Sequence, residues 1–236
     1  MDLHDKVVVI TGASAGIGHA TALELAEAGA KLVVTARRAE LLDDLAGKLG
    51  DRVAVLAADI AAPDTAQQLY DLAVDRFGAA DVLINNAGVL LTPTVDDVDL
   101  DALAMLIRVN FEAVVRSSYV FGAAFKARGS GQIINVSSIG AHLRPARWGV
   151  YSGLKAGVEM FTRSLRTELQ SSGVRVGLIS PGSVQTEMLA SALPGDAWRE
   201  KALQPADIAK AIRFMLEQPE RAHVVDMLLF GSSDPS

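Results

Sequence analysis

Short runs of β-branched and aliphatic residues alternate along this chain with longer segments whose apolar positions recur at helical spacing. Such alternation predicts strand–helix–strand units and a parallel sheet. Strands are expected at residues 6–11, 31–36, 52–57, 82–85, 132–136, 174–179 and 227–230. Helices are expected at residues 17–28, 39–49, 64–77, 100–128, 150–171 and 205–217. The apolar run Val7-Val8-Val9-Ile10 indicates a strand that is buried on both faces.

The same pattern predicts one α/β domain over residues 1–236. A chain of 236 residues can build one large core, and no linker, repeat or low-complexity segment divides it. Residues 186–203 contain Gly, Pro and residues of mixed polarity. We interpret this stretch as a short substrate flap or helical insertion rather than as a domain boundary.

Composition narrows the classes of function. The net charge of −6, from 22 basic and 28 acidic residues, argues against a nucleic-acid partner, because phosphate binding needs a basic surface. No apolar run is long enough to span a membrane, and the first residues lack the layout of a secretory signal. Cysteine is absent and the four histidines are scattered, so no metal site is expected. The absence of cysteine also favours a cytoplasmic location.

A glycine-rich turn follows the first expected strand and leads into the first expected helix. It reads Thr11-Gly12-Ala13-Ser14-Ala15-Gly16-Ile17-Gly18. Glycines let the backbone approach a pyrophosphate, and free amides at the start of a helix attract its oxygens. We therefore predict a dinucleotide-binding loop, although such turns also occur without a ligand. The predicted contacts are Gly12, Ser14, Ala15, Gly16, Ile17 and Gly18.

The end of the second expected strand bears on which dinucleotide binds. Ala36 stands where an acidic residue would bind a ribose 2′-hydroxyl, and Arg37 and Arg38 follow it. Two guanidinium groups favour a 2′-phosphate, so NADP(H) is expected over NAD(H). The alternative is that both arginines begin a solvated helix face. After the third expected strand, Asp59 and Ile60 could contact the adenine, or Asp59 could simply cap the strand end.

Tyr151 and Lys155 stand four residues apart in an expected helix and therefore share one of its faces. An ammonium beside a phenol favours the phenolate and is expected to lower the pKa of Tyr151. A tyrosine tuned in this way can exchange a proton with an alcohol oxygen near neutral pH. Taken alone, the spacing is also typical of a solvated polar pair.

Together these residues resemble the short-chain dehydrogenase/reductase family. The matching features run in the family's order over nearly the whole chain, and several motifs in register are more specific than any one of them. They are the glycine-rich turn, Asn85-Asn86-Ala87-Gly88, Asn110, Ser138, Tyr151 with Lys155, and Pro181-Gly182.

The resemblance implies a single Rossmann-like, doubly wound sheet of seven parallel strands in the order 3-2-1-4-5-6-7, with helices on both faces. It implies an NADP(H)-dependent oxidoreductase of small-molecule ketones, aldehydes or secondary alcohols, with Tyr151 as the acid and base. It assigns catalysis to Asn110, Ser138, Tyr151 and Lys155. It assigns further cofactor contacts to Asn86, Ala87, Gly88, Tyr151, Lys155, Pro181, Gly182, Val184 and Thr186. The segment 221–229 is most similar to bacterial NADP-dependent 3-hydroxy acid and hydroxy-aldehyde dehydrogenases.

The substrate pocket is expected beside these positions. Predicted substrate contacts are Ser138, Trp148, Tyr151 and Met188; Trp148 could equally be an ordinary buried indole. Arg144 and Arg147 could attract a carboxylate, although solvated loop arginines are commoner, and His142 is expected to have a structural role. Neighbouring positions that could line the pocket are Leu90, Leu91, Thr92, Ile139, Leu143 and Val184.

Two other functions use the same features: a regulator that senses NADP(H) without chemistry, and an NADP-assisted isomerase or dehydratase. A regulator is expected to lose the tyrosine or the lysine, and this chain keeps both. The resemblance also implies a homodimer or homotetramer. Val158, Phe161 and Leu165 form an apolar stripe that could serve a subunit contact or face the core.

Overall fold

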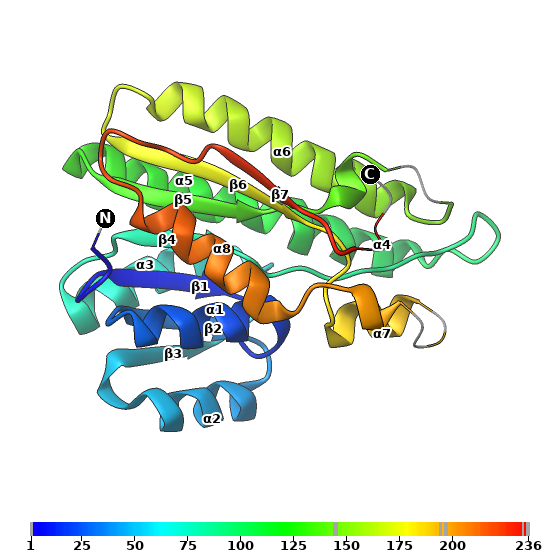
Figure 1. The fold of residues 1–236 in the computed structure, drawn as a ribbon, viewed down its shortest axis with the longest axis horizontal. Helices are drawn as coiled ribbons and strands as arrows, with labels where there is room; N and C mark the ends of the chain where they lie inside the picture. Colours follow the sequence, from blue (N-terminus) through cyan, green and yellow to red (C-terminus); the bar gives the residue numbers. More distant parts are fainter. Residues whose placement is uncertain (1, 144–145, 194, 196–197, 233, 235–236) are drawn as a thin grey trace.

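Seven parallel strands form one sheet in the computed structural model, which describes residues 2–143, 146–193, 195, 198–232 and 234 (Figure 1). The strands are β1 (Val7–Thr11), β2 (Lys31–Ala36), β3 (Val53–Ala57), β4 (Val82–Asn85), β5 (Gly131–Val136), β6 (Val174–Pro181) and β7 (Asp226–Leu229). Their order, β3-β2-β1-β4-β5-β6-β7, confirms the prediction.

Eight α-helices surround this sheet within the described residues. They are α1 (Gly16–Glu27), α2 (Ala39–Leu49), α3 (Thr65–Phe77), α4 (Leu100–Ile107), α5 (Ala113–Arg128), α6 (Gly149–Leu169), α7 (Glu187–Ala192) and α8 (Pro205–Glu217).

Alternate residues of the central strands belong to two different cores. Val8 and Ile10 pack with α1, α2 and α8 on one face of the sheet, whereas Val7 and Val9 pack with α3, α5 and α6 on the other. Each of these four side chains is at most 2% exposed. A strand covered on both faces has no polar side, which explains its uninterrupted apolar sequence.

The long helix expected at residues 100–128 is interrupted. A π-helical segment, Arg108–Glu112, separates α4 from α5, so the prediction of one continuous helix is wrong. The apolar positions continue at nearly helical spacing through this segment, and one extra residue in a single turn leaves no mark on such a pattern. The displaced turn carries Asn110.

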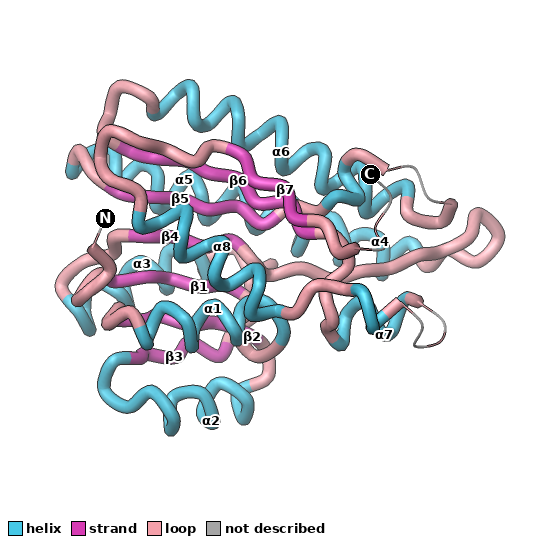
Figure 2. The backbone as a smooth tube through the Cα atoms, viewed as in Figure 1, coloured by secondary structure: helices cyan, strands magenta, loops and turns pink. Residues whose placement is uncertain are grey.

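The segments that carry the predicted site residues lie at the carboxyl ends of the strands. Every strand pairing is parallel, so the carboxyl ends of all seven strands point the same way, as the arrows show (Figure 1). Loops and α7 lie at this end of the sheet (Figure 2). The sequential order of the strands reverses between β1 and β4, and ligands of such sheets bind outside this switch point. The predicted flap contains α7 and a 3₁₀ turn at Arg199–Lys201.

The apolar stripe on α6 faces mainly the core. Val158 and Leu165 are at most 3% exposed, and Phe161 is half-buried against the same cores. Val158 and Leu165 therefore face the core, whereas part of the Phe161 ring reaches the surface beside the exposed Tyr119. Among the residues that the structure describes, no helix has both the length and the hydropathy of a membrane span. The described His, Asp and Glu side chains likewise form no group of three that could hold a metal ion.

Candidate active site

A cavity of about 640 Å³ lies at the carboxyl ends of the strands. We call it the reaction cleft. It is lined by every predicted catalytic, cofactor-binding and substrate-contact residue except Gly18, from the glycine-rich turn to Tyr151 and Met188. Of the neighbouring positions that could line it, Leu91 and Thr92 do not. The fold therefore gathers into one cleft residues that lie as far apart in the sequence as Gly12 and Met188.

The glycines of the first turn are required by close packing. Gly12 has a positive φ of 71°, and a side chain on it would lie 2.8 Å from the Cα of Ala87. A side chain on Gly18 would collide with the Gly12 carbonyl oxygen and the Asn86 amide. Gly18 therefore packs α1 against the strands, which is why it lies behind the cleft lining rather than in it.

Thr11 and Asn86 join the two loops that flank the strand-order reversal. The Thr11 hydroxyl accepts hydrogen bonds from the backbone N–H groups of Asn86 and Ala87, each at 3.0 Å. The Asn86 amide donates to the carbonyl oxygen of Thr11 at 2.9 Å and to that of Gly12 at 3.2 Å. These bonds hold the glycine-rich turn against the end of β4.

Both predicted phosphate-binding arginines line the reaction cleft, but Arg38 already has partners. Its Nη1 lies 2.9 Å from Oε2 of Glu187 on α7, and its Nε and Nη2 donate to the Ser14 hydroxyl at 3.3 and 3.2 Å. An arginine between the glycine-rich turn and the flap is placed to bind an anion. Glu187 would compete with that anion for the guanidinium.

Asp59 has the structural role considered for it, and its contact with the adenine stays a prediction. Its Oδ1 accepts the N–H of Ala61 at 2.9 Å, and its carbonyl oxygen accepts the Thr65 hydroxyl, so it organises the turn into α3. Asp59 and Ile60 also line the cleft beside Arg37.

Helix α6 and the end of β5 bring Tyr151 and Ser138 together. Tyr151 is 8% exposed, and a hydrogen bond links its phenol to the Ser138 hydroxyl. Ser138 Oγ also accepts the N–H of Gly140 at 3.0 Å, which fixes the turn that follows β5. The Trp148 ring meets the Tyr151 ring edge-on, with centroids 5.7 Å apart. Trp148 is partly exposed and forms a wall of the cleft, so it is not an ordinary buried indole, and its contact with a substrate stays a prediction.

Lys155 and Asn110 complete the group. The Lys155 ammonium donates to the Val136 carbonyl oxygen at 3.0 Å and lies 5.8 Å from the centroid of the Tyr151 ring. Asn110 is fully buried and donates to the carbonyl oxygens of Val89 and Leu106, at 2.8 and 3.0 Å.

Gly88 keeps the space between these two groups free. A side chain on it would lie 3.0 Å from Asn110 Oδ1 and 3.9 Å from Lys155 Nζ. Asn110 reaches this place because the π-helical turn changes the backbone hydrogen bonding around it, and its side chain takes up the Leu106 carbonyl instead.

Burial controls the proton affinities in this cleft. It raises the pKa of Tyr151, and the hydrogen bond from Ser138 opposes that rise with a smaller effect. It lowers the pKa of Lys155 to about 8. The predicted lowering of the Tyr151 pKa is therefore wrong, because removing the phenol from water disfavours the phenolate more than its neighbours favour it.

A buried carboxylate, missed at the sequence level, lies behind these residues. Glu159 is 3% exposed and accepts the hydroxyls of Ser180 at 2.9 Å and Ser137 at 3.2 Å. Its Oε1 also lies 3.1 Å from His142 Nε2, and its Oε2 lies 3.5 Å from Arg163. The contact between His142 and Glu159 agrees with the structural role expected for His142. Glu159 stands one helical turn after Lys155. At such a position the sequence alone does not show whether the carboxylate is buried or exposed to solvent.

Two further acidic residues of the cleft were not foreseen. Glu187 and Asp234 both line it. Asp234 accepts the backbone N–H groups of Ser183 and Gly231, so the end of the chain folds back over the β6 end. Glu187 and Asp234 each lie in a segment without a recognisable sequence motif.

Two arginines were considered for carboxylate binding. Arg144 lies outside the described residues. Arg147 donates to the Thr92 carbonyl oxygen at 2.9 Å and does not line the cleft.

The sequence of this chain matches the model of the short chain dehydrogenase family over residues 6–196. It is 36% identical over 223 residues to an uncharacterized oxidoreductase of Staphylococcus aureus strain USA300; the match covers 94% of this chain and 95% of that protein.

Solved structures of two enzymes superpose on nearly the whole chain. One is an alcohol dehydrogenase from the archaeon Thermococcus sibiricus complexed with 5-hydroxy-NADP, at a TM-score of 0.89 and 27% identity over 99% of both chains. The other is a 3-ketoacyl-(acyl-carrier-protein) reductase from Brucella melitensis complexed with NADH, at a TM-score of 0.90 and 29% identity over 98% of both chains.

Proposed function

Because this chain belongs to the short-chain dehydrogenase/reductase family of oxidoreductases, we propose that it is an NADPH-dependent reductase of small-molecule ketones and aldehydes, reversible on secondary alcohols. The observation that carries this proposal is the convergence of Tyr151, Ser138 and Lys155 in one cleft with the glycine-rich turn. A dinucleotide lying along the cleft would reach from Arg37 to Tyr151.

Reduction of a carbonyl group requires the transfer of a hydride to its carbon and of a proton to its oxygen. Bound in the cleft, NADP(H) supplies or accepts the hydride. Tyr151 gives its proton to the carbonyl oxygen during reduction and takes it back during oxidation. The Ser138 hydroxyl donates a hydrogen bond to the same oxygen as negative charge develops on it. Lys155 would hold the nicotinamide ribose, and Asn110 would order the path by which a proton returns to Lys155.

The raised pKa of Tyr151 fits this division of roles. A phenol that stays protonated at neutral pH is in the form that a proton donor needs. The pKa of Lys155 is about 8, so its side chain is protonated in most molecules at pH 7. Its positive charge can stabilise the phenolate that forms.

The test is the removal of one oxygen atom. Tyr151→Phe should lower turnover of NADPH with ketones and aldehydes by about a hundredfold or more, since general acid catalysis contributes roughly 10²–10⁴-fold. The dissociation constant of NADPH should change little. Tyr119→Phe, on the exposed side of α5, is the matched control. Retention of more than about a tenth of the wild-type rate by Tyr151→Phe would contradict the proposal.

The preference for NADPH over NADH is proposed from Arg37 and Arg38. Structural neighbours are known with cofactors of both kinds, so the arginines carry this part of the argument. Arg37→Ala combined with Arg38→Asp should weaken NADPH binding by about tenfold or more and leave NADH nearly unaffected, because only NADPH loses charge-assisted contacts. Dissociation constants for both cofactors measure the change, with Arg116→Ala on α5 as the control. An unchanged ratio would remove the arginines from the proposal.

We further propose a homodimer or homotetramer in the cytoplasm. Family membership supports the first point, and the absence of cysteine from the sequence is in keeping with the second. Sedimentation equilibrium of the purified chain measures the subunit number.

A further inference from the structure

A second cavity adjoins the reaction cleft. It has a volume of about 700 Å³ and lies between the start of α4, the loop after β4 and α7. We call it the outer pocket. Five residues line both cavities: Gly88, Val89, Leu90, Glu187 and Met188. Gly88 lies beside Asn110 and Lys155, so the outer pocket adjoins the catalytic part of the reaction cleft.

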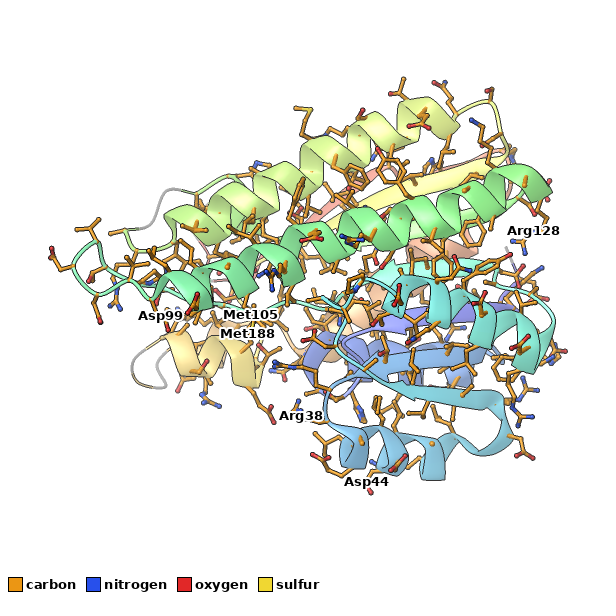
Figure 3. All side chains as sticks on the ribbon, turned by 180° about the vertical axis from the view of Figure 1, so that it is seen from behind. Arg38, Asp44, Asp99, Met105, Arg128 and Met188 are labelled. Carbon is orange, nitrogen blue, oxygen red and sulfur yellow. The ribbon has the colours of Figure 1, made fainter. Side chains whose placement is uncertain are left out.

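The walls of the outer pocket are mainly apolar. Leu91, Met105 and Met188 contribute to them and are 37%, 47% and 38% exposed. Met105 comes from α4 and Met188 from α7, and Figure 3 shows the two side by side. Methionine side chains adapt to ligands of irregular shape. The pocket is therefore suited to the apolar body of a substrate whose carbonyl group lies in the reaction cleft.

Charge at its rim restricts the ligand further. Asp99, Asp101 and Glu187 are the charged residues among its described lining, and no lysine or arginine is among them. Glu187 is paired with Arg38. Asp99 caps α4 by accepting the N–H groups of Asp101 and Ala102, whereas the Asp101 carboxylate is exposed.

The negative charge extends along the loop before α4. Asp96 and Asp97 are exposed there as well, and within the described part of the chain no ion pair to a lysine or arginine involves them, Asp99 or Asp101. Arg147, a candidate cation of the sequence analysis, donates to the Thr92 carbonyl oxygen and lines neither cavity. Carboxylates and phosphates are ordinarily bound by arginine or lysine, and a field of one sign at a pocket mouth selects against ligands of that sign.

We propose that the outer pocket receives the apolar part of a neutral or cationic ketone or aldehyde, and that it disfavours substrates bearing a carboxylate or a phosphate. This inference rests on the proposed function and names its substrate class. It contrasts with the keto acids that a hydroxy-acid dehydrogenase would reduce.

The test is a series of benzaldehydes that differ only in remote charge. Each carries, through an ethylene spacer in the para position, a tert-butyl, a trimethylammonium or a carboxylate group. The first two groups have nearly the same shape, and the spacer keeps the electronic character of the carbonyl constant. We expect kcat/KM with NADPH to be about tenfold lower for the carboxylate than for the neutral aldehyde, and the cationic aldehyde to equal or exceed the neutral one. The difference should shrink as ionic strength rises.

Variants locate the effect. Asp101→Asn should reduce the penalty on the carboxylate about threefold, and Met105→Lys should remove it. Asp44→Asn is the matched control, because Asp44 is exposed on α2 and lines neither cavity (Figure 3). It should leave the ranking unchanged. An effect of Asp44→Asn equal to that of Asp101→Asn would show a general charge effect and overturn the assignment to this pocket.

Binding separates this inference from the proposed function. The dissociation constants of the three aldehydes, followed by tryptophan fluorescence, should give the same ranking without turnover. If the carboxylate is bound and reduced as well as the neutral aldehyde, the inference is overturned and the reductase stands. If none is reduced while the ranking by affinity holds, the reductase is overturned and the selectivity of the pocket stands.

Discussion

At the scale of single residues, this protein depends on two groups whose ionisation is governed by burial. Tyr151 and Lys155 are both withdrawn from water, and burial favours the neutral form of each. For the phenol this is the form that donates a proton. For the lysine it is a cost, because an ammonium buried near a phenol is less stable than one in water.

The cost of burying Lys155 predicts how stability depends on pH. The pKa of Lys155 is 10.5 ordinarily and about 8 in the folded chain. Between these values the unfolded chain holds a proton that the folded chain has released, so the free energy of unfolding rises as pH rises. Below pH 8, where Lys155 is charged in both states, burial of its ammonium lowers the free energy of unfolding by the full amount. The expected rise is up to roughly 3 kcal/mol.

Urea unfolding of the wild type and Lys155→Met from pH 8 to 10 measures this rise. The upper bound is the ordinary pKa of tyrosine, 10.0, above which Tyr151, whose pKa is raised, adds the opposite slope. Lys155→Met should lack the rise, whereas Lys210→Met, at an exposed position of α8, should keep it. Equal slopes in all three proteins would show that Lys155 titrates in the folded chain as it does in water.

At the scale of elements, helix α6 organises the active site. Tyr151, Lys155 and Glu159 follow one another at intervals of one turn and are all buried. Tyr151 reaches the Ser138 turn, Lys155 reaches the end of β5, and Glu159 reaches Ser180 at the end of β6. One helix face thus fixes two strand ends relative to the reactive phenol.

Loss of the Glu159 charge should therefore affect catalysis through position. Glu159→Gln keeps the size of the side chain but leaves several donors with one carbonyl oxygen in place of two carboxylate oxygens. We expect kcat to fall about tenfold, KM for NADPH to change less than about threefold, and stability to fall by roughly 1–3 kcal/mol. Glu168→Gln, exposed on the same helix, is the control. A parallel loss of kcat and of NADPH binding would instead indicate a general collapse of the site.

At the scale of the whole molecule, one sheet joins two cores. The face that holds α1, α2 and α8 and the face that holds α3, α5 and α6 share every central strand. Neither core can form without the sheet, so the chain should unfold in one cooperative step. The single domain that the sequence predicts is open to the same test.

Phe121 lies fully buried in the core of α3, α5 and α6, edge-on to Tyr70 and Phe125. Phe121→Ala should lower the free energy of unfolding by about 3–5 kcal/mol, whereas Phe214→Ala, which is 54% exposed, should cost less than about 1 kcal/mol. Urea unfolding followed by tryptophan fluorescence and by far-ultraviolet circular dichroism should give coincident curves. Separate transitions by the two probes would indicate two units.

The sequence allowed most of the fold to be predicted, because its signals are local. Apolar runs such as Val7–Thr11 identify buried strands, and family motifs such as the glycine-rich turn fix their order. The π-helical turn at Asn110 was not predicted, since helical spacing tolerates one extra residue. Nor was Glu159, because its burial depends on where β5 and β6 end.

The sequence by itself determined the strands and the glycine loop through short-range patterns, and the strand order and the residues that meet at Tyr151 through motifs that match a known family. Only the tertiary structure decided how acidic the phenol is, which partner Arg38 holds, and what surrounds the outer pocket. The physical reason is that desolvation and ion pairing depend on distances between segments far apart in the chain, such as the 149 residues from Arg38 to Glu187.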